Sequence, residues 1–129
     1  NVHLRPQLSD AGSVVSGYFT TDAIRESQIR RYIERLDDDL PTLIVGDFNE
    51  SSGDAIEFLA GRGLRSALGE FHPGEPTWRW TTSMGQVTSQ LDHLAYDRRL
   101  LPLDTWVIHG GRSDHLPVVG ILVLASESS

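Results

Sequence analysis

The spacing of apolar residues predicts one long helix in the first part of the chain. Apolar side chains recur there at every third or fourth position, as in a helix with one buried face; they are Ile29, Tyr32, Ile33, Leu36 and Leu40. We expect an amphipathic helix of about four turns, lying on a sheet and ending in a solvated turn at residues 37–39. Thr21 or Asp22 can cap its start, so residues 5–21 are predicted to form a long connection.

Short apolar runs predict strands in the rest of the chain. Residues 42–45 follow Pro41 and are typical of a strand buried on both faces. Residues 117–124 are nearly all apolar and predict a second fully buried strand. Weaker patterns predict strands at residues 77–80, 90–96 and 104–109, and a short helix at residues 54–60. This order of elements predicts a mixed α/β fold.

Polar residues follow the first buried strand directly. Gly46 permits a sharp exit, and Asp47 and Asn49 then emerge at the carboxyl end of the strand, where α/β folds usually place their chemistry. A carboxylate there can bind a cation or accept a proton, and the amide can donate to a developing anion. The alternative is an ordinary turn, because Gly, Asp and Asn all favour turns.

Two later segments each contain an aspartate followed by a histidine. Asp92 and His93 lie in a predicted strand, where Asp92 either needs a partner in the core or faces water at the strand end. Asp114 and His115 follow two glycines in a loop before the last strand. An aspartate there can bind a metal, and a histidine can act as acid, base or phosphate donor. His3 ends a short alternating segment at the start of the chain.

Composition and charge fit one globular domain without a disulfide framework. The chain has 129 residues, 39% hydrophobic content and no cysteine. All 11 basic residues are arginine and the net charge is −7. This balance argues against general affinity for a nucleic-acid backbone but leaves open an acidic site that gathers a divalent cation. No run approaches the roughly 20 apolar residues of a membrane span, and nothing in the sequence assigns a compartment.

Together, four motifs resemble those of the endonuclease/exonuclease/phosphatase superfamily. In chain order they are Asn-x-His-Leu, Gly-Asp-Phe-Asn, Leu-Asp-His-Leu and Ser-Asp-His-x-Pro-Val. Arg25-x-x-Gln28 on the predicted helix is also similar to the family's usual pattern. The resemblance covers nearly the whole chain, and the pairing of Gly-Asp-x-Asn with Ser-Asp-His is its most specific part.

The resemblance implies a fold and a reaction. The fold is a four-layer α/β sandwich, as in deoxyribonucleases, in which two mixed sheets pack face to face with helices outside. Residues 42–45 and 118–124 would then lie in the same sheet. The reaction is hydrolysis of a phosphate ester with a divalent cation, Mg²⁺ or Mn²⁺.

The resemblance also implies roles for individual residues. Asp47 would orient or deprotonate the attacking water, and Asp47, Asn49 and Asp114 would bind the metal. Asn49 would also help to hold the phosphate. These oxygen ligands suit a hard cation.

The remaining roles concern two histidines and their partner. His115 would donate to a phosphate oxygen in the transition state, with Asp92 orienting its ring, and His3 would be a second histidine facing the phosphate. We therefore expect the site residues to converge on one side of the fold and His115 to contact Asp92; the converging residues would be Asp47, Asn49, Asp92, Asp114 and His115, with His3 nearby.

One departure from the family affects the domain organisation. The family carries a metal-binding glutamate in an N-terminal half, and neither Glu50 nor Glu57 stands at a matching position. Residues 1–129 are thus expected to be the C-terminal portion of the domain, with the N-terminal half absent. That half, or a second copy in a homodimer, is expected to cover the inner face of the sheet. The predicted phosphoesterase would be active when the domain is complete; the alternative is a non-catalytic binding or assembly module derived from this family.

The substrate is expected to be a small phosphodiester, a lipid headgroup or a nucleic acid, and the negative charge makes a long DNA duplex the least attractive of these. Trp78 and Trp80 share one face of a predicted strand and could stack on a base or a headgroup, with Arg79 opposite. The alternative is that both tryptophans pack in the core.

Overall fold

The computed structural model of the protein describes residues 1–6 and 14–126. Its helices are α1 (Val14–Ile33), α2 (Asp54–Gly61) and α3 (Ala67–Phe71). Its strands are β1 (Val2–His3), β2 (Leu43–Asp47), β3 (Arg65–Ser66), β4 (Trp78–Thr82), β5 (Gly85–Ser89), β6 (Asp92–Tyr96), β7 (Leu100–Val107) and β8 (Val118–Leu124).

The strand that carries Gly-Asp-Phe-Asn lies inside a mixed sheet. The sheet has four strands in the order β1-β2-β6-β3; β1 is parallel to β2, whereas β6 is antiparallel to both β2 and β3. The hairpins β4–β5 and β7–β8 form separate two-stranded sheets. The predicted α/β class, a mixed sheet with flanking helices, is therefore confirmed.

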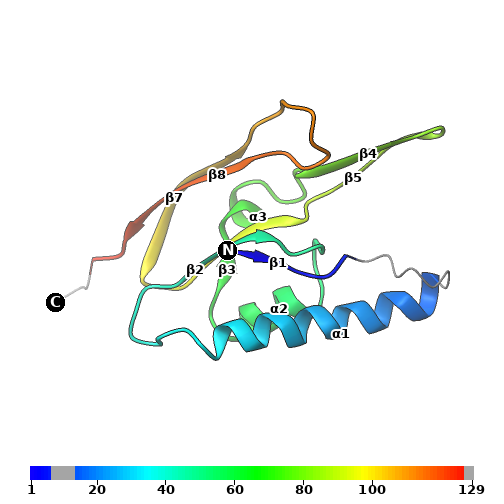
Figure 1. Ribbon diagram of the computed structural model, residues 1–129. Helices are drawn as coiled ribbons and strands as arrows, with labels where there is room; N and C mark the ends of the chain where they lie inside the picture. The colour runs from blue at the N-terminus through cyan, green and yellow to red at the C-terminus, as the bar shows by residue number, and fades with distance from the viewer. Residues whose placement is uncertain (7–13, 127–129) are drawn as a thin grey trace.

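The two faces of the central sheet are covered differently. Helices α1 and α2 lie together on one side, and the long β7–β8 hairpin arches over the other (Figure 1). Ile29 of α1 and Leu59 of α2 are buried against β1, β2 and β6 on the first side. Leu94 of β6 is buried with residues of α3, β7 and β8 on the second. Gly120 allows this close approach, because a Cβ there would lie 2.8 Å from Leu94 Cδ2.

Helix α1 begins and ends earlier than predicted. It already includes residues 14–21, so the expected cap at Thr21 or Asp22 is wrong; residues 7–13 of the predicted connection lie outside the described residues. It ends at Ile33, and Leu36 and Leu40 are exposed in the turns that follow. The three aspartates at residues 37–39 would be unfavourable at the C-terminus of a longer helix, which is consistent with the early end at Ile33.

The two strands expected to be fully buried are not. In β2, Ile44 is buried on the helix side, Val45 packs partly on the other side, and Leu43 is exposed. In β8, Ile121, Val123 and Leu124 are exposed. For β8 the cause is that it pairs with β7 in a hairpin of its own and does not join the sheet of β2, contrary to the expectation from the resemblance.

Two elements were not predicted at all. Helix α3 has only five residues, and the Ser66 hydroxyl that accepts from the Gly69 backbone N–H caps it. Strand β5 pairs with β4 through a tight turn and is mostly polar, so it lacks an apolar run. Among the described residues, no helix has the length and apolar character needed to cross a membrane.

Candidate active site

Strand register brings three of the predicted residues into one row. His3 of β1 pairs with Asp47 of β2, and Asp47 pairs with Asp92 of β6. Residues paired directly across neighbouring strands point to the same face of a sheet. The row lies at the end of β2 and the start of β6, on the side of the sheet where Val45 and Leu94 meet β7–β8. The chain therefore places a histidine and two carboxylates together at one edge.

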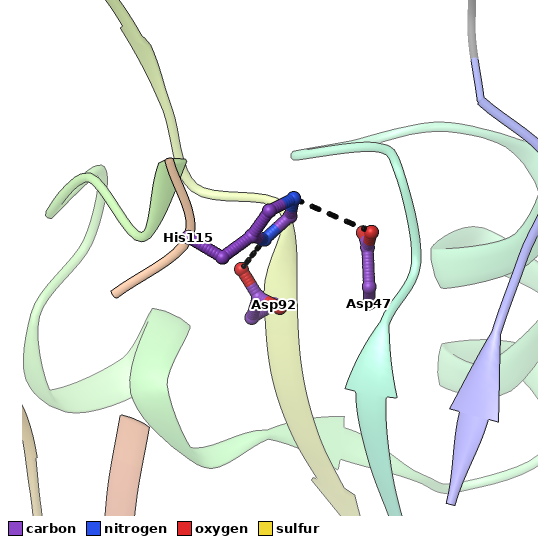
Figure 2. A group of neighbouring side chains, drawn as sticks. All are labelled: Asp47, Asp92 and His115. Carbon is purple, nitrogen blue, oxygen red and sulfur yellow. Dashed lines mark hydrogen bonds and ion pairs between the residues drawn. The ribbon is translucent and has the colours of Figure 1, made fainter. Parts of the chain in front are cut away.

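His115 reaches this row from the loop between β7 and β8 and lies between the two carboxylates (Figure 2). Its Nδ1 is 2.9 Å from Asp92 Oδ2, and its Nε2 is 3.5 Å from Asp47 Oδ2. His3 Nε2 lies 3.4 Å from the same Asp47 oxygen. His115 contacts Asp92 as expected. Of the residues expected to converge, His3, Asp92 and His115 meet at Asp47.

The environment shifts the protonation of the two central groups. Burial raises the pKa of the Asp47 carboxyl, although the Asn49 backbone N–H and the nearby His115 oppose this. Burial lowers the pKa of His115, but the hydrogen bond to Asp92 and the charges of Asp92 and Asp47 outweigh it, so that the net shift is upward. A cationic imidazole between two carboxylates is thus favoured, and Asp47 holds its proton more readily than an ordinary aspartate.

Asn49 holds the Asp47 carboxylate from the loop that follows β2. Its backbone N–H donates to Asp47 Oδ1 at 2.8 Å, and its side-chain Nδ2 donates to Asp47 Oδ2 at 3.1 Å and to the Leu4 carbonyl oxygen at 2.8 Å. Asn49 has a φ of 53°, a left-handed conformation that asparagine adopts more easily than most residues. Both amide hydrogens are therefore engaged, which leaves the amide oxygen as the group available to a ligand.

Gly46 is required by the packing of β1 against β2. Its φ is 142°, and a Cβ at this position would lie 1.9 Å from the Val2 carbonyl oxygen. No side chain fits without moving β1, and β1 carries His3. The glycine of the Gly-Asp-Phe-Asn motif thus sets the spacing between two residues of the row.

A buried ion network lies behind the Asp47 loop. Arg25 of α1 and Glu50 are both fully buried, and Arg25 Nε donates to Glu50 Oε2 at 2.7 Å. Arg25 also pairs with Asp22, and Glu50 Oε1 accepts from the Ile56 backbone N–H at the start of α2. The sequence alone gave Glu50 no role. The Arg25-x-x-Gln28 pattern could have pointed to a buried partner, because Arg25 lies on the helix face that meets the sheet.

His93 fastens the same loop from the strand that carries Asp92. Its Nε2 donates to the Glu50 carbonyl oxygen at 2.8 Å, and its Nδ1 accepts from the Ser66 hydroxyl at 2.9 Å. The ring is buried, and burial lowers its pKa, so it is neutral. The Leu-Asp-His-Leu motif therefore places its two polar residues on opposite faces: Asp92 at the site and His93 in the supporting structure.

Thr77, which directly precedes β4, positions Asp92. Its buried hydroxyl oxygen accepts from the backbone N–H groups of Leu91 and Asp92 at 2.9 and 3.0 Å. Its carbonyl oxygen accepts from Leu116 N–H at 2.6 Å, next to His115. One threonine thus ties together the two segments that supply the Asp92–His115 pair, a role that sequence reasoning missed because threonine is common in strands.

Asp114 lies apart from the three central residues. Its Oδ2 accepts from the Trp78 indole N–H at 3.2 Å, and this bond contributes most to lowering the pKa of its exposed carboxyl. The group of ligand atoms that lie within 4.8 Å of one another comprises Asp47, Asp92 and His115. The predicted role of Asp114 as a metal ligand stays a prediction.

The chemistry of the central group suits a divalent cation. Two carboxylates and an imidazole present ligand atoms at one edge, and Asn49 is bonded to one of the carboxylates. Carboxylate and amide oxygens suit Mg²⁺ and Mn²⁺, whereas an imidazole nitrogen suits Zn²⁺ or Ni²⁺ better and binds a metal only when it is unprotonated. The residues present therefore fit a hard cation held mainly by the aspartates.

Comparison with protein families identifies a match over most of the chain. The Endonuclease/Exonuclease/phosphatase family matches residues 9–115, which include α1, the Asp47 loop, Asp92 and His115. Comparison with curated proteins yields no match. Comparison with solved structures yields none either.

Proposed function

Because the chain belongs to the Endonuclease/Exonuclease/phosphatase family, we propose that Asp47, Asp92 and His115 form part of a phosphoesterase active site. Membership indicates a hydrolase of the phosphoesterase type. The observation that carries the proposal is the position of the His115 ring between the Asp92 and Asp47 carboxylates. A phosphoryl transition state spreads negative charge over its oxygens, and a fixed cationic donor stabilises that charge.

His115 and Asp92 act together in this proposal. Asp92 accepts the Nδ1 proton, so the ring keeps its orientation and its positive charge. Nε2 then carries a proton that it can donate to a phosphate oxygen. His3 contacts Asp47 from the other side and supplies a second donor when it is charged.

Asp47 is the proposed base. The pKa of its carboxyl is raised and so lies closer to neutral pH than that of an ordinary aspartate, which makes the carboxylate a better base toward water. Asn49 holds the carboxylate in place through two hydrogen bonds and offers its amide oxygen to the phosphate or to a cation. Asp47 and Asn49, with Asp92 or Asp114, would hold Mg²⁺ or Mn²⁺, which would supply Lewis-acid stabilisation of the phosphate charge.

Binding of Mn²⁺ to the chain tests this proposal without relying on turnover. In a ¹H–¹⁵N NMR titration, paramagnetic Mn²⁺ should first broaden the backbone signals of Asp47, Asp92 and His115. The double variant Asp47→Asn/Asp92→Asn should lose this response. The acidic residues 37–39 serve as an internal control, and broadening that begins there and spares the three site residues would contradict the site.

The exposed apolar face of the β7–β8 hairpin supports a proposal about the complete fold. Leu101 pairs with Val123, both are exposed, and Ile121 is exposed beside them. Clustered apolar surface of this kind marks a contact. We propose that this chain contributes its mixed sheet and helices to a four-layer sandwich, with the other layers supplied by an N-terminal half or by a second copy. Light scattering distinguishes a dimer from a monomer, and a stable monomer would contradict the second-copy arrangement.

A further inference from the structure

A cleft beside the candidate active site combines arginine and tryptophan side chains. It has a volume of about 340 Å³ and is lined by Arg79 and Trp80 of β4 and by Arg112 and Asp114 of the loop before His115. The Arg79 backbone N–H donates to the Asp114 carbonyl oxygen at 2.9 Å. The cleft is therefore attached to the segment that places His115, and the hairpin that forms its other wall projects from the body of the protein (Figure 1).

Trp80 presents an open aromatic surface in this cleft. The residue is 56% exposed, so the alternative that both tryptophans pack in the core is wrong for Trp80. Its cross-strand partner is Val87, which is also exposed, whereas Trp78 is half-buried and bonded to Asp114. Tryptophan is usually highly buried, and nucleobases stack on such exposed rings whatever their sequence.

The cleft carries more positive than negative charge in a chain whose net charge is −7. Arg79 Nη2 donates to the Gly111 carbonyl oxygen at 3.4 Å, which directs its guanidinium toward the loop. Arg112 is exposed and makes no ion pair with any residue that the structure describes. Asp114 is the acidic residue of the lining, and one of its oxygens already accepts from Trp78. Guanidinium groups bind phosphate in a planar, bidentate manner.

We propose that this cleft binds a nucleotide unit of the substrate, with a base stacked on Trp80 and a neighbouring phosphate held by Arg79 and Arg112. The substrate class is then a short nucleotide phosphodiester. A choline-type headgroup shares the phosphate, but its ammonium group would have to lie on Trp80 next to two arginines, whereas a base brings no positive charge to the cleft. An isolated phosphate has no ring for Trp80. The proposal rests on the proposed phosphoesterase function and identifies the substrate for that site.

The indole N–H signals of the protein provide a direct test. The probe is the 5′-phosphorylated thymidine dinucleotide pTpT, titrated in EDTA so that no turnover occurs. The Trp80 signal should shift most, and the signal of Trp106 on β7 should not move. Trp80→Ala should weaken binding roughly fivefold or more. Arg112→Gln should also weaken it, whereas Arg98→Gln, the same charge change at the other end of β6, should not.

Separate titrations distinguish this cleft from the active site. Mg²⁺ with inorganic phosphate, followed at the ring signals of His115, tests the active site alone. A response at His115 with no shift of Trp80 in pTpT would overturn the cleft and leave the proposed function standing. A response at Trp80 with none at His115 would support the cleft and contradict the proposed function. Glycerophosphocholine that shifts Trp80 as strongly as pTpT would overturn the nucleotide assignment.

Discussion

Asp47 and Asp92 stand opposite each other in the last antiparallel pair of β2 and β6, and the His115 ring contacts both carboxylates. Two adjacent carboxylates repel each other unless a cation or a proton lies between them. The imidazolium of His115 supplies that cation when no metal is bound. The protonation of the ring and the placement of the two carboxylates therefore depend on each other.

Replacement of Asp92 by asparagine should lower the pKa of His115. The variant Asp92→Asn removes a neighbouring negative charge and replaces the carboxylate that accepts the Nδ1 proton by a weaker, neutral acceptor. The titration of the His115 ring protons in NMR measures the shift. Asp114→Asn is the matched control, since it removes a charge without a hydrogen bond to the ring, and it should lower the pKa less. An equal shift in the two variants would show that Asp92 does not hold the ring.

Loss of either central group should impair catalysis in a complete, active domain. His115→Ala and Asp47→Asn should each reduce kcat by the amount typical of one electrostatic group, roughly 2.7–4 kcal/mol of transition-state stabilisation. Hydrolysis of bis-p-nitrophenyl phosphate with Mg²⁺ or Mn²⁺ measures this, and thermal unfolding should remain nearly unchanged. His109→Ala, at an exposed histidine that pairs with Glu75, serves as the control and should keep full activity. Full turnover in either site variant would refute the proposed roles.

The variant Gly46→Ala should destabilise the fold and displace His3. The new methyl group would meet the Val2 carbonyl oxygen, and the φ of 142° is unfavourable for alanine. We expect a loss of about 1–3 kcal/mol or more in the free energy of unfolding. Gly61→Ala in α2, where a Cβ meets no atom within 4 Å, should be neutral or stabilising. Urea denaturation compares the two, and equal stabilities would contradict the close packing of β1.

Breaking the buried ion pair should cost far more than breaking a surface pair. Arg25→Met leaves the buried Glu50 carboxylate without its counter-ion, and we expect a loss of about 3–5 kcal/mol. The pair between Arg30 and Glu26 on the exposed side of α1 is the control. Arg30→Met should cost about 1 kcal/mol or less. A small effect at Arg25 would mean that the network does not hold the Asp47 loop.

Acid should destabilise the fold through His93. Burial lowers the pKa of His93 in the folded protein. Below about pH 6.5, the ordinary pKa of histidine, the ring is therefore protonated in the unfolded chain but still neutral in the folded protein. This contribution is present above that pH and is lost as the pH falls from about 6.5 toward the folded pKa. His115 acts in the opposite sense, since its raised pKa adds stability at low pH that is lost as the pH rises through the folded value.

The variant His93→Gln isolates the first of these contributions. Thermal unfolding between pH 7 and about 5.5 should show a smaller loss of stability in His93→Gln than in the wild type. Identical pH profiles for His93→Gln and the wild type would show that His93 is not held neutral in the folded protein.

Local patterns along the chain determined much of this protein. A β-rich run before Gly46 and an apolar face on the segment around Ile29 each depend on neighbours within a few residues, so the α/β class, β2 and part of α1 could be predicted. The motif residues Asp47 and His115 were found in the same way, because Asp47 ends an apolar strand and His115 stands in a loop just before one.

Long-range pairing decided the rest. The register of β2 with β6 sets Asp47 beside Asp92, and the course of the β7–β8 hairpin brings His115 to both. No local pattern predicts that β8 lies outside the sheet of β2 or that the Glu50 side chain is buried against Arg25. A charged residue such as Glu50 is predicted to be exposed unless its partner is known, and that partner, Arg25, lies 25 residues away in the sequence on another element. Hydrogen bonding and burial across distant segments therefore decided the geometry of the site, whereas the sequence alone indicated which residues form it.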